Sequence, residues 1–74
     1  MEQRVSEILA ENAGREPEEL SGETRLVGDL GLSSFDMANI AVQVEQELGM
    51  HIPDERFPEF ETVDDVLRII EEVK

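Results

Sequence analysis

The sequence contains no cysteine and few aromatic residues, namely Phe35, Phe57 and Phe60. Without cysteine, neither disulfide bonds nor thiolate metal sites can contribute to the fold. With so few aromatic side chains, aliphatic residues must do most of the packing in the core. The apolar runs are only a few residues long, which excludes a transmembrane helix and a signal peptide. We therefore expect a cytoplasmic protein that does not insert into membranes.

Basic residues are also scarce, because six Lys and Arg stand against nineteen Asp and Glu, giving a formal net charge of −13. Nucleic-acid binding requires clustered positive charge, so this function class is excluded. The negative electrostatic field of such a chain repels anionic membranes. It favours partners with basic patches, mainly by raising association rates at low salt. The alternative explanation is that the acidic surface only keeps a small protein in solution.

The sequence offers little for catalysis. Its one histidine, His51, is expected in an exposed turn, and nothing around Ser34 suggests a nucleophile elbow or an oxyanion hole. Adjacent carboxylates do not follow a pattern that would bury one and expose the other, so we interpret them as solvated faces. These pairs are Glu18-Glu19, Asp64-Asp65 and Glu71-Glu72. The acidic spacing of a calcium loop is absent as well, so we expect neither an enzyme nor a metal site.

Seventy-four residues are enough for one domain, which we expect to span residues 1–74. A chain of this size buries about 60% of its unfolded surface, so its stability should be on the order of 4–11 kcal/mol. Apolar residues recur at three- and four-residue steps in three segments, which predicts three main helices. These helices are expected from Glu2 to Ala13, from Ser34 to about Leu48 and from Thr62 onward.

Particular residues suit the ends of these helices. Gly14 and Gly49 each follow an expected helix at its C-terminus. Thr62 begins the last helix, and Asp65 three residues later completes a variant capping box. The inner faces are expected to be Val5, Ile8, Leu9 and Ala13; Met37, Ile40, Ala41, Val44 and Leu48; and Val63, Val66, Leu67, Ile70 and Val73.

The connection over residues 15–33 is too long for a structureless loop in a compact domain. Its apolar residues predict a loop that is pinned to the core, through Leu20, Leu26, Val27, Leu30 and Leu32. Pro17 suits the start of a short helical turn over residues 18–20. A second short helix is expected from Asp54 to Phe57, ended or limited by Pro58. The predicted fold is therefore all-α, a small bundle of three main helices plus one short helix.

Two serines stand where the second helix begins. Ser33 suits the N-cap, with Asp36 three residues later reaching back to complete a capping box. Ser34 would then be the first helical residue, with a free hydroxyl at a position where backbone N–H groups and the helix dipole favour negative charge. That position could carry a phosphodiester, although a spare serine at a helix start is also common.

The surrounding segment closely resembles the attachment motif of acyl carrier proteins. In that family an aspartate–serine–leucine triplet follows a leucine–glycine–hydrophobe run and starts the second helix. The matching stretch here is Asp29-Leu30-Gly31-Leu32-Ser33-Ser34-Phe35-Asp36-Met37. The resemblance covers nearly the whole chain, including the first helix, the long loop and residues 45–49, 52–55 and 62–66.

The resemblance implies a carrier and not a catalyst. The serine that matches the family's attachment site is Ser34, which would receive 4′-phosphopantetheine from coenzyme A through a magnesium-dependent phosphopantetheinyl transferase. The thiol at the end of this arm would hold acyl intermediates as thioesters. Partner enzymes with basic patches would read the second helix, and the matching contact residues are Ser33, Phe35, Asp36, Met37, Glu45 and Glu47. The protein would act as a monomer.

The same resemblance suggests that acyl chains are sheltered between the helices. The residues that would line this pocket are Met37, Ile40, Ala41, Val44 and Ile52. Most of them are also ordinary core residues by their spacing, and the two roles are compatible.

The chain departs from the family's pattern at four positions. Ser33 replaces the usual aspartate, Phe35 replaces leucine, Asn39 stands where many members have glutamate, and Pro58 falls within the short third helix. These departures fit a specialised carrier at least as well as a general fatty-acid carrier.

Two alternatives remain open at this point. An aminoacyl or peptidyl carrier of a nonribosomal pathway would use the same mechanism, although many such carriers have glycine where this chain has Leu32. An acidic helical adaptor without a prosthetic group would bind a basic partner, with Ser34 as an ordinary first-turn serine or a kinase target.

Overall fold

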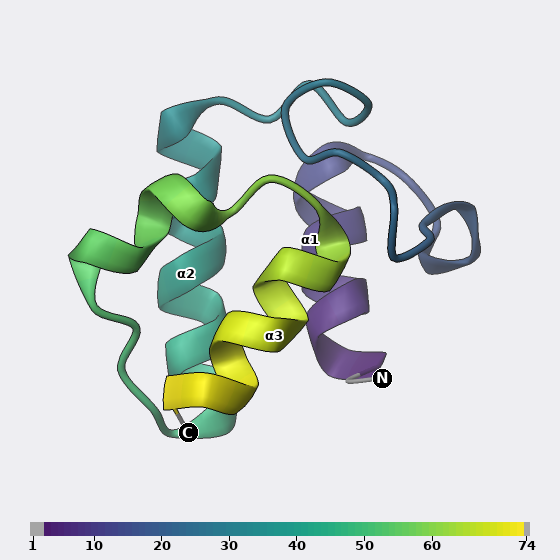
Figure 1. Ribbon diagram of the computed structural model, residues 1–74. Helices are drawn as coiled ribbons and strands as arrows, with labels where there is room; N and C mark the ends of the chain where they lie inside the picture. Colours follow the sequence, from purple (N-terminus) through teal and green to yellow (C-terminus); the bar gives the residue numbers. More distant parts are fainter. Residues whose placement is uncertain (1–2, 74) are drawn as a thin grey trace.

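The computed structural model describes residues 3–73, which fold into three α-helices and two short 3₁₀ helices (Figure 1). The order along the chain is α1 (Gln3–Ala13), η1 (Pro17–Glu19), α2 (Ser34–Leu48), η2 (Asp54–Glu59) and α3 (Val63–Val73). Within this part of the chain, the only strand-like pairing is an isolated bridge between Arg25 and Thr62. The predicted all-α class is confirmed. No described helix is long and apolar enough to cross a membrane.

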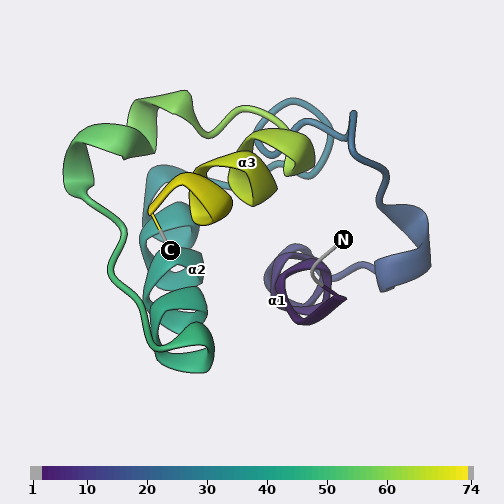
Figure 2. The ribbon, with the colours of Figure 1, turned by 60° about the horizontal axis from the view of Figure 1, so that its bottom comes forward.

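The helices α1 and α2 pack side by side and run in opposite directions. Arg4 near the start of α1 pairs with Glu47 at the end of α2, with Nη2 and Oε1 3.1 Å apart. One to two turns from these positions, Asn12 donates a hydrogen bond to Gln43 at 3.0 Å. Figure 2 shows that α3 lies across one side of this pair, so that apolar faces of all three helices meet.

The core is aliphatic, as the composition predicts. It contains side chains from the three helices, from the long loop and from the segment after α2. The buried apolar residues are Val5, Ile8, Leu9, Ala10, Leu26, Leu30, Leu32, Ile40, Ala41, Val44, Ile52, Val63, Val66, Ile69 and Ile70. Met37, Leu48, Phe57, Phe60 and Leu67 pack against this core and are partly buried.

Two predictions about the core need correction. Val27 does not pin the loop to the core, because its side chain is 64% exposed while the neighbouring Leu26 is fully buried. The chain turns sharply here, with the N–H of Leu32 donating to the carbonyl of Leu26 at 3.1 Å, so successive side chains point to opposite sides. Ile69, which was not assigned to the inner face of the last helix, is fully buried.

The predicted helix caps are present. The N–H of Asp65 donates to Thr62 Oγ1 at 3.2 Å, and the N–H of Thr62 donates to Asp65 Oδ2 at 3.0 Å. Thr62 therefore caps α3, which begins one residue later than Thr62, at Val63. Gly49 ends α2 in the left-handed region, with φ of 64°. The expected first helix begins at Gln3 in the described residues, and Glu2 lies outside them.

The long loop is fixed to the start of α3 by backbone hydrogen bonds. Leu26 donates to the carbonyl of Glu61 at 2.9 Å, and Val63 donates to the carbonyl of Thr24 at 3.0 Å. The predicted turn after Pro17 is present as η1. Because these hydrogen bonds fix the loop to the start of α3, the residues that follow the loop hold a defined position at the start of α2.

The second short helix is longer than predicted, since η2 continues through Pro58 to Glu59. The reason lies in its hydrogen bonds. The N–H of Phe60 donates to the carbonyl of Phe57 at 3.0 Å, so Pro58 is the first residue inside that turn. Proline is tolerated at this position because its missing N–H would have no partner there.

Candidate functional site

The chain reaches α2 through a tight turn between two buried leucines. Leu30 and Leu32 are both buried and flank Gly31, which has φ of 69° and no steric contact on the side where a Cβ would lie. The N–H of Gly31 donates to the carbonyl of Val27 at 3.0 Å, and the carboxylate of Asp29 accepts from the N–H of Arg25 at 2.8 Å. This turn anchors the chain and leaves the next two residues, Ser33 and Ser34, on the surface.

Ser33 is fully engaged in the cap of α2. Its Oγ accepts a hydrogen bond from the N–H of Asp36 at 3.1 Å, and its own N–H donates to Asp36 Oδ2 at 2.9 Å. Ser33 Oγ also donates to the same carboxylate oxygen at 3.0 Å. The capping box predicted for Ser33 and Asp36 is thus confirmed. It also brings the Asp36 carboxylate next to Ser33, so a negative charge stands close to the position where the acyl carrier motif has its aspartate.

Ser34 is the first residue of α2, and it is exposed. Within residues 3–73, its Oγ has no hydrogen-bond partner, in contrast to the Oγ of Ser33. The backbone N–H groups of Ser34 and Phe35 belong to the first turn of α2 and are likewise free of partners in the described residues. A free hydroxyl beside unpaired N–H groups at a helix N-terminus is suited to carry a phosphate ester.

A hollow of about 310 Å³ opens beside Ser34. Residues of the long loop, the first turn of α2 and η2 line it, and all except Ser34 are apolar. The lining residues are Val27, Ser34, Met37, Phe57, Pro58 and Phe60. The rings of Phe57 and Phe60 are stacked, with centroids 5.6 Å apart and planes at 28°. Sequence reasoning assigned no functional role to the loop and η2 residues, because their approach to Ser34 depends on how the loop and η2 fold back.

The residues predicted to line an acyl pocket differ in their burial within residues 3–73. Met37 lines the hollow beside Ser34. The others, Ile40, Ala41, Val44 and Ile52, are no more than 4% exposed and lie in the closed core. The structure thus places them together, but as packed residues around the inner face of α2.

The predicted partner-contact residues along α2 differ in how freely they face solvent. Phe35, next to Ser34, is 74% exposed, an unusual position for a large aromatic side chain. Glu45 is turned inward, because its Oε2 accepts from the N–H of Ile52 at 2.7 Å and lies 3.1 Å from Nδ1 of His51. Glu47 pairs with Arg4. His51 is exposed, as predicted.

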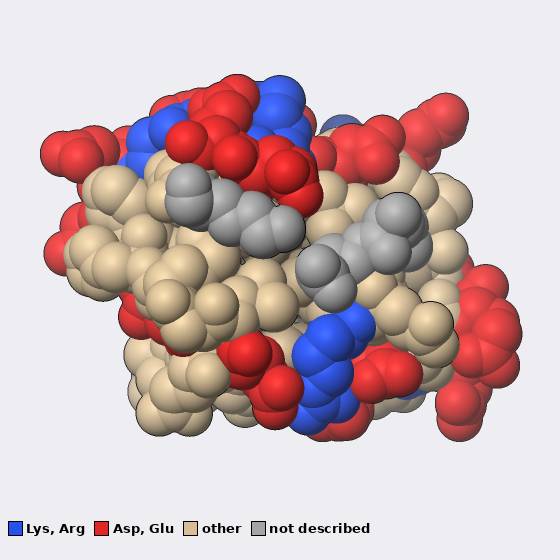
Figure 3. All heavy atoms as spheres, turned by 90° about the horizontal axis from the view of Figure 1, so that it is seen from below, with Lys and Arg blue, Asp and Glu red and all other residues tan. Residues whose placement is uncertain are grey.

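Arginine side chains lie among carboxylates and form no separate basic patch on the face drawn in Figure 3. Arg56 pairs with Glu59 and Glu72, and Arg68 pairs with Glu72 and Asp65. The hydrogen bond from Arg56, assisted by Arg68, lowers the pKa of Glu72 below its ordinary value. Most of the few positively charged side chains therefore form ion pairs with carboxylates of the same chain. The remaining acidic side chains determine the electrostatic field around the protein.

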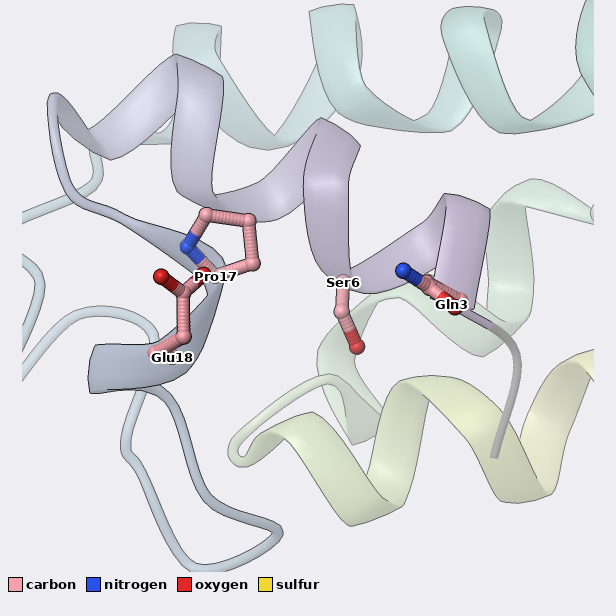
Figure 4. Close-up of a pocket in the computed structure, with 4 residues that line it drawn as sticks. All are labelled: Gln3, Ser6, Pro17 and Glu18. Carbon is pink, nitrogen blue, oxygen red and sulfur yellow. The ribbon is translucent and has the colours of Figure 1, made fainter.

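A second hollow, of about 330 Å³, lies between α1 and η1. Figure 4 shows Ser6 pointing away from the axis of α1, with Gln3 on the same helix and Pro17 and Glu18 on η1. Ser6 is buried, and its Oγ has no hydrogen-bond partner in the described part of the chain. Because Arg4 pairs with Glu47, this start of α1 lies beside the end of α2, away from Ser34.

Comparison with known proteins identifies the family to which this chain belongs. The family described as "Phosphopantetheine attachment site" matches residues 3–70. Two acyl carrier proteins of Rickettsia bellii are 36% and 38% identical over 74 residues, which is 100% of this chain and 86% and 91% of those proteins. The meromycolate extension acyl carrier protein of Mycobacterium leprae is 40% identical over 70 residues, covering 95% of this chain and 61% of that protein.

The chain belongs to the phosphopantetheine-attachment family and is of the acyl carrier type. It carries covalently attached 4′-phosphopantetheine and holds acyl groups in biosynthesis of the fatty-acid or polyketide type. Members of this family are carriers that work with transferases and synthases. The residues at the start of α2 fit such a group, since an apolar hollow lies beside a hydroxyl and two N–H groups that have no partner within residues 3–73.

Proposed function

We propose that Ser34 carries the phosphopantetheine group. The observation that supports this most strongly is the contrast between two adjacent serines at the start of α2. Ser33 Oγ makes two hydrogen bonds to Asp36, whereas Ser34 Oγ is exposed and free of partners in residues 3–73. A hydroxyl that takes no part in the fold can be esterified without loss of a structural contact.

The loading reaction is a phosphoryl transfer in which Ser34 is the acceptor. Ser34 Oγ forms a bond to the pantetheine-bearing phosphorus of coenzyme A, and the pyrophosphate bond breaks to release adenosine 3′,5′-bisphosphate. The hydroxyl proton passes to a base of the transferase, whose magnesium stabilises the leaving phosphate. The N–H groups of Ser34 and Phe35 favour the resulting phosphodiester at the N-terminus of α2. The terminal thiol of the group then supplies the thioester chemistry.

The protein itself would contribute presentation and not catalysis. In support of this, the one histidine, His51, lies past the far end of α2 beside Glu45, and so does not reach Ser34. We propose that loading occurs in the cytoplasm, where coenzyme A is available, and that the chain acts as a single-domain monomer over residues 1–74.

Partner enzymes would dock on the exposed start and outer face of α2. Phe35 offers a large apolar contact beside the attachment residue, flanked by Ser33, Asp36 and Met37. Glu45 and Glu47, further along the helix, would meet basic residues of the partner. These acids already have partners within the chain, so docking would compete with the Arg4–Glu47 pair and the contacts of Glu45.

Long acyl cargo would enter the core along α2. The residues proposed to line its path are Met37, Ile40, Ala41, Val44 and Ile52. Four of these are closed to solvent, so entry would require α2 to move apart from its neighbours.

Mass spectrometry of the loaded protein tests the assignment of Ser34. The wild type, Ser34→Ala and Ser33→Ala are incubated with coenzyme A, magnesium and a broad-specificity phosphopantetheinyl transferase, and the modified peptide is sequenced. We expect fragment ions that place the group on residue 34 in the wild type and in Ser33→Ala, and no modification in Ser34→Ala. Modification of Ser34→Ala, or a group located on Ser33, would refute the assignment.

A second experiment separates acyl cargo from aminoacyl cargo. The holo-protein is offered to an acyl-activating enzyme with a fatty acid and, separately, to an aminoacyl-adenylating enzyme with its amino acid. Thioester formation with the fatty acid alone is the expected result. Loading with the amino acid alone would favour the peptidyl carrier alternative.

A further inference from the structure

The hollow between α1 and η1 contains a polar group that the fold itself does not use. Ser6 is only 3% exposed, and its Oγ has no hydrogen-bond partner within residues 3–73. Figure 4 shows its hydroxyl directed away from the axis of α1, toward the hollow that it lines. Leaving a buried hydroxyl unpaired destabilises a protein, so this group points to a ligand that supplies the missing hydrogen bond.

The residues around Ser6 determine which ligand chemistry the hollow accepts. Gln3 lies one turn earlier on the same face of α1, and Glu18 lines the hollow from η1. Both side chains have oxygen atoms that accept hydrogen bonds, as does the hydroxyl of Ser6. Pro17 adds an apolar ring to the same lining. The hollow therefore offers several acceptors, including a carboxylate, next to an apolar surface.

This combination disfavours the other common classes of ligand. The described lining contains a carboxylate and no lysine or arginine, so an anion would be repelled. A purely apolar ligand would leave the Ser6 hydroxyl without a partner. A calcium ion needs many oxygen ligands, and the described residues contain no cluster of acidic or histidine side chains that could hold a metal ion. The chemistry that fits is a cation that donates hydrogen bonds and has an aliphatic part.

A lysine side chain has these properties. Its ammonium donates three hydrogen bonds and accepts none, which matches a carboxylate, a hydroxyl and an amide oxygen on separate residues. Its methylene stem can lie against the ring of Pro17. The planar fork of arginine suits the two oxygens of one carboxylate better than separate acceptors. A cavity of about 150 Å³ holds benzene, so a hollow of about 330 Å³ has room for a lysine side chain.

The charges around the hollow favour a basic protein as the source of this side chain. Glu18 forms no ion pair within residues 3–73, whereas the neighbouring Glu19 lies 3.9 Å from Arg15. The carboxylate of Glu18 is therefore available to a partner. The net charge of −13 also attracts proteins with basic surfaces and repels acidic ones.

We propose that the hollow formed by Gln3, Ser6, Pro17 and Glu18 binds a lysine side chain of a partner protein. Ser6 and Gln3 accept hydrogen bonds from the ammonium, and Glu18 balances its charge. Pro17 contacts the methylene stem. Occupation by the ammonium gives the buried hydroxyl of Ser6 the partner that the fold does not provide.

This surface is separate from the start of α2. The pairing of Arg4 with Glu47 places the start of α1 beside the end of α2, away from Ser34. A protein that binds here leaves Ser34 accessible, so one partner can hold the carrier while another acts at Ser34. Binding of the lysine side chain does not depend on which residue carries the phosphopantetheine group.

Titration followed by nuclear magnetic resonance tests this site with a defined probe. The nitrogen-15-labelled protein, with and without phosphopantetheine, is titrated with N-acetyl-lysine methylamide. We expect saturable shifts of the backbone amides around Ser6 and Glu18 in both forms. The ε-methylene of the probe should show nuclear Overhauser contacts to the β-protons of Ser6. N-acetyl-norleucine methylamide, which lacks the ammonium, should show neither effect.

Variants separate the hollow from the general acidity of the surface. Ser6→Ala removes an acceptor and Glu18→Gln removes a charge. Each should weaken binding of the lysine probe by about tenfold, the scale of one hydrogen bond to a charged group. Glu23→Gln is the matched control and should leave binding unchanged, because Glu23 is exposed on the same loop but does not line the hollow.

The stability of Ser6→Ala gives a second readout without any ligand. The midpoint of its thermal unfolding should equal or exceed that of the wild type, because the hydroxyl has no partner to lose within residues 3–73. A lower midpoint would show that the hydroxyl serves the fold, and it would overturn the inference. The Overhauser contacts of the wild type need no variant, so a misfolded variant does not affect them.

The outcomes of the titration distinguish this site from its alternatives. If the lysine probe shows no saturable binding, the hollow holds water alone and the inference is wrong. Equal weakening by Glu23→Gln would also overturn it, because the probe would then respond only to net charge. Equal or tighter binding of N-acetyl-arginine methylamide would refute lysine as the occupant. None of these results would change the proposed attachment at Ser34.

Discussion

At the scale of single residues, the hydroxyls of Ser33 and Ser34 differ in their contacts, and the proposed attachment at Ser34 rests on this difference. Ser33 Oγ is held between the N–H and the carboxylate of Asp36, so it is committed to the start of α2. Ser34 Oγ is free in the described structure and remains available for esterification. In the acyl carrier motif an aspartate occupies the position of Ser33, and the Asp36 carboxylate beside it supplies a nearby negative charge in this chain.

The two serines should therefore respond differently to replacement by alanine. Ser33→Ala removes an N-cap and should lower the free energy of unfolding by about 1 kcal/mol. Ser34→Ala removes an exposed hydroxyl without a partner and should change it by less than about 0.5 kcal/mol. Urea denaturation of the unmodified proteins measures both values. A larger loss for Ser34→Ala than for Ser33→Ala would contradict the division of roles.

At the residue scale, the features that depend on residues close together in the sequence could be predicted. Ser33, Asp36, Thr62 and Asp65 are capping residues whose hydrogen bonds span three positions, so their spacing alone identifies them. The exposure of Val27 could not be predicted, because it depends on a turn that the spacing of apolar residues does not describe.

At the scale of helices, the ends of the elements are fixed by a few special residues, whereas their packing depends on the whole chain. Gly49 ends α2 in a left-handed conformation, and the N–H of Gly49 donates to the carbonyl of Glu45. This cap is followed by the turn that returns Ile52 to the core. The end of α2 therefore influences both the helix and the segment that leads to η2.

Gly49→Ala should destabilise the protein by about 1 kcal/mol, because a Cβ in the left-handed region costs on the order of 1–2 kcal/mol. Gly28→Ala is the matched control. Gly28 has no such φ value, and a Cβ there would meet Arg25 side-chain atoms at 3.4 Å or more. Thermal denaturation of the two variants gives the comparison. Equal stability of Gly49→Ala and the wild type would show that α2 does not depend on this cap.

The cap of α3 predicts that the free energy of unfolding depends on pH. Partial burial opposes ionisation of Asp65, but hydrogen bonds from the N–H groups of Thr62 and Glu61 and from Arg68 outweigh it and lower its pKa. A carboxyl whose pKa is lower in the folded state stabilises that state at pH above its unfolded value of about 3.9. This stabilisation is lost as the pH falls from that value through the lower, folded pKa.

Asp65→Asn removes this titration while keeping a similar shape. The stability difference between the wild type and Asp65→Asn should be largest near neutral pH and should shrink as the pH falls below about 4. Urea denaturation of both proteins over a pH series measures the difference at each step. A difference that stays constant across this range would show that the Asp65 carboxylate contributes nothing through its charge.

The existence of the three α-helices could be predicted from the sequence, whereas the hollow beside Ser34 could not. The residue spacing located α1, α2 and α3, and it indicated that the loop was attached to the core. The extension of η2 through Pro58 and the stacking of Phe57 on Phe60 were missed. They depend on how η2 folds back along α2, which is a tertiary arrangement without a local signal in the sequence.

At the scale of the whole molecule, charge is the dominant feature. Nineteen acidic residues against six basic ones give a net charge of −13 on a chain of 74 residues. Most described arginines pair with carboxylates at the surface, as Arg4 does with Glu47. Pairs of this kind are worth about 0–1 kcal/mol each, so repulsion among the remaining acids should prevail.

Salt should therefore stabilise the protein. Raising sodium chloride from about 0.01 M to 0.5 M shortens the screening length from about 30 Å to a few ångströms and weakens repulsion across the whole surface. The midpoint of thermal unfolding should rise over this range. The pH is kept constant and no chemical denaturant is added, so that only the salt concentration changes between measurements. A midpoint that falls with salt would mean that the arginine pairs outweigh the repulsion.

The central claim is that this chain holds acyl groups as thioesters on an arm attached to Ser34. The most direct measurement is the intact mass of the wild type and Ser34→Ala after transferase treatment, after acylation, and after exposure to hydroxylamine. The wild type should gain one phosphopantetheine, then one acyl group, and hydroxylamine should remove the acyl group alone. Ser34→Ala should show no change at any step. An acyl group that hydroxylamine does not release, or one that appears on Ser34→Ala, would contradict the account.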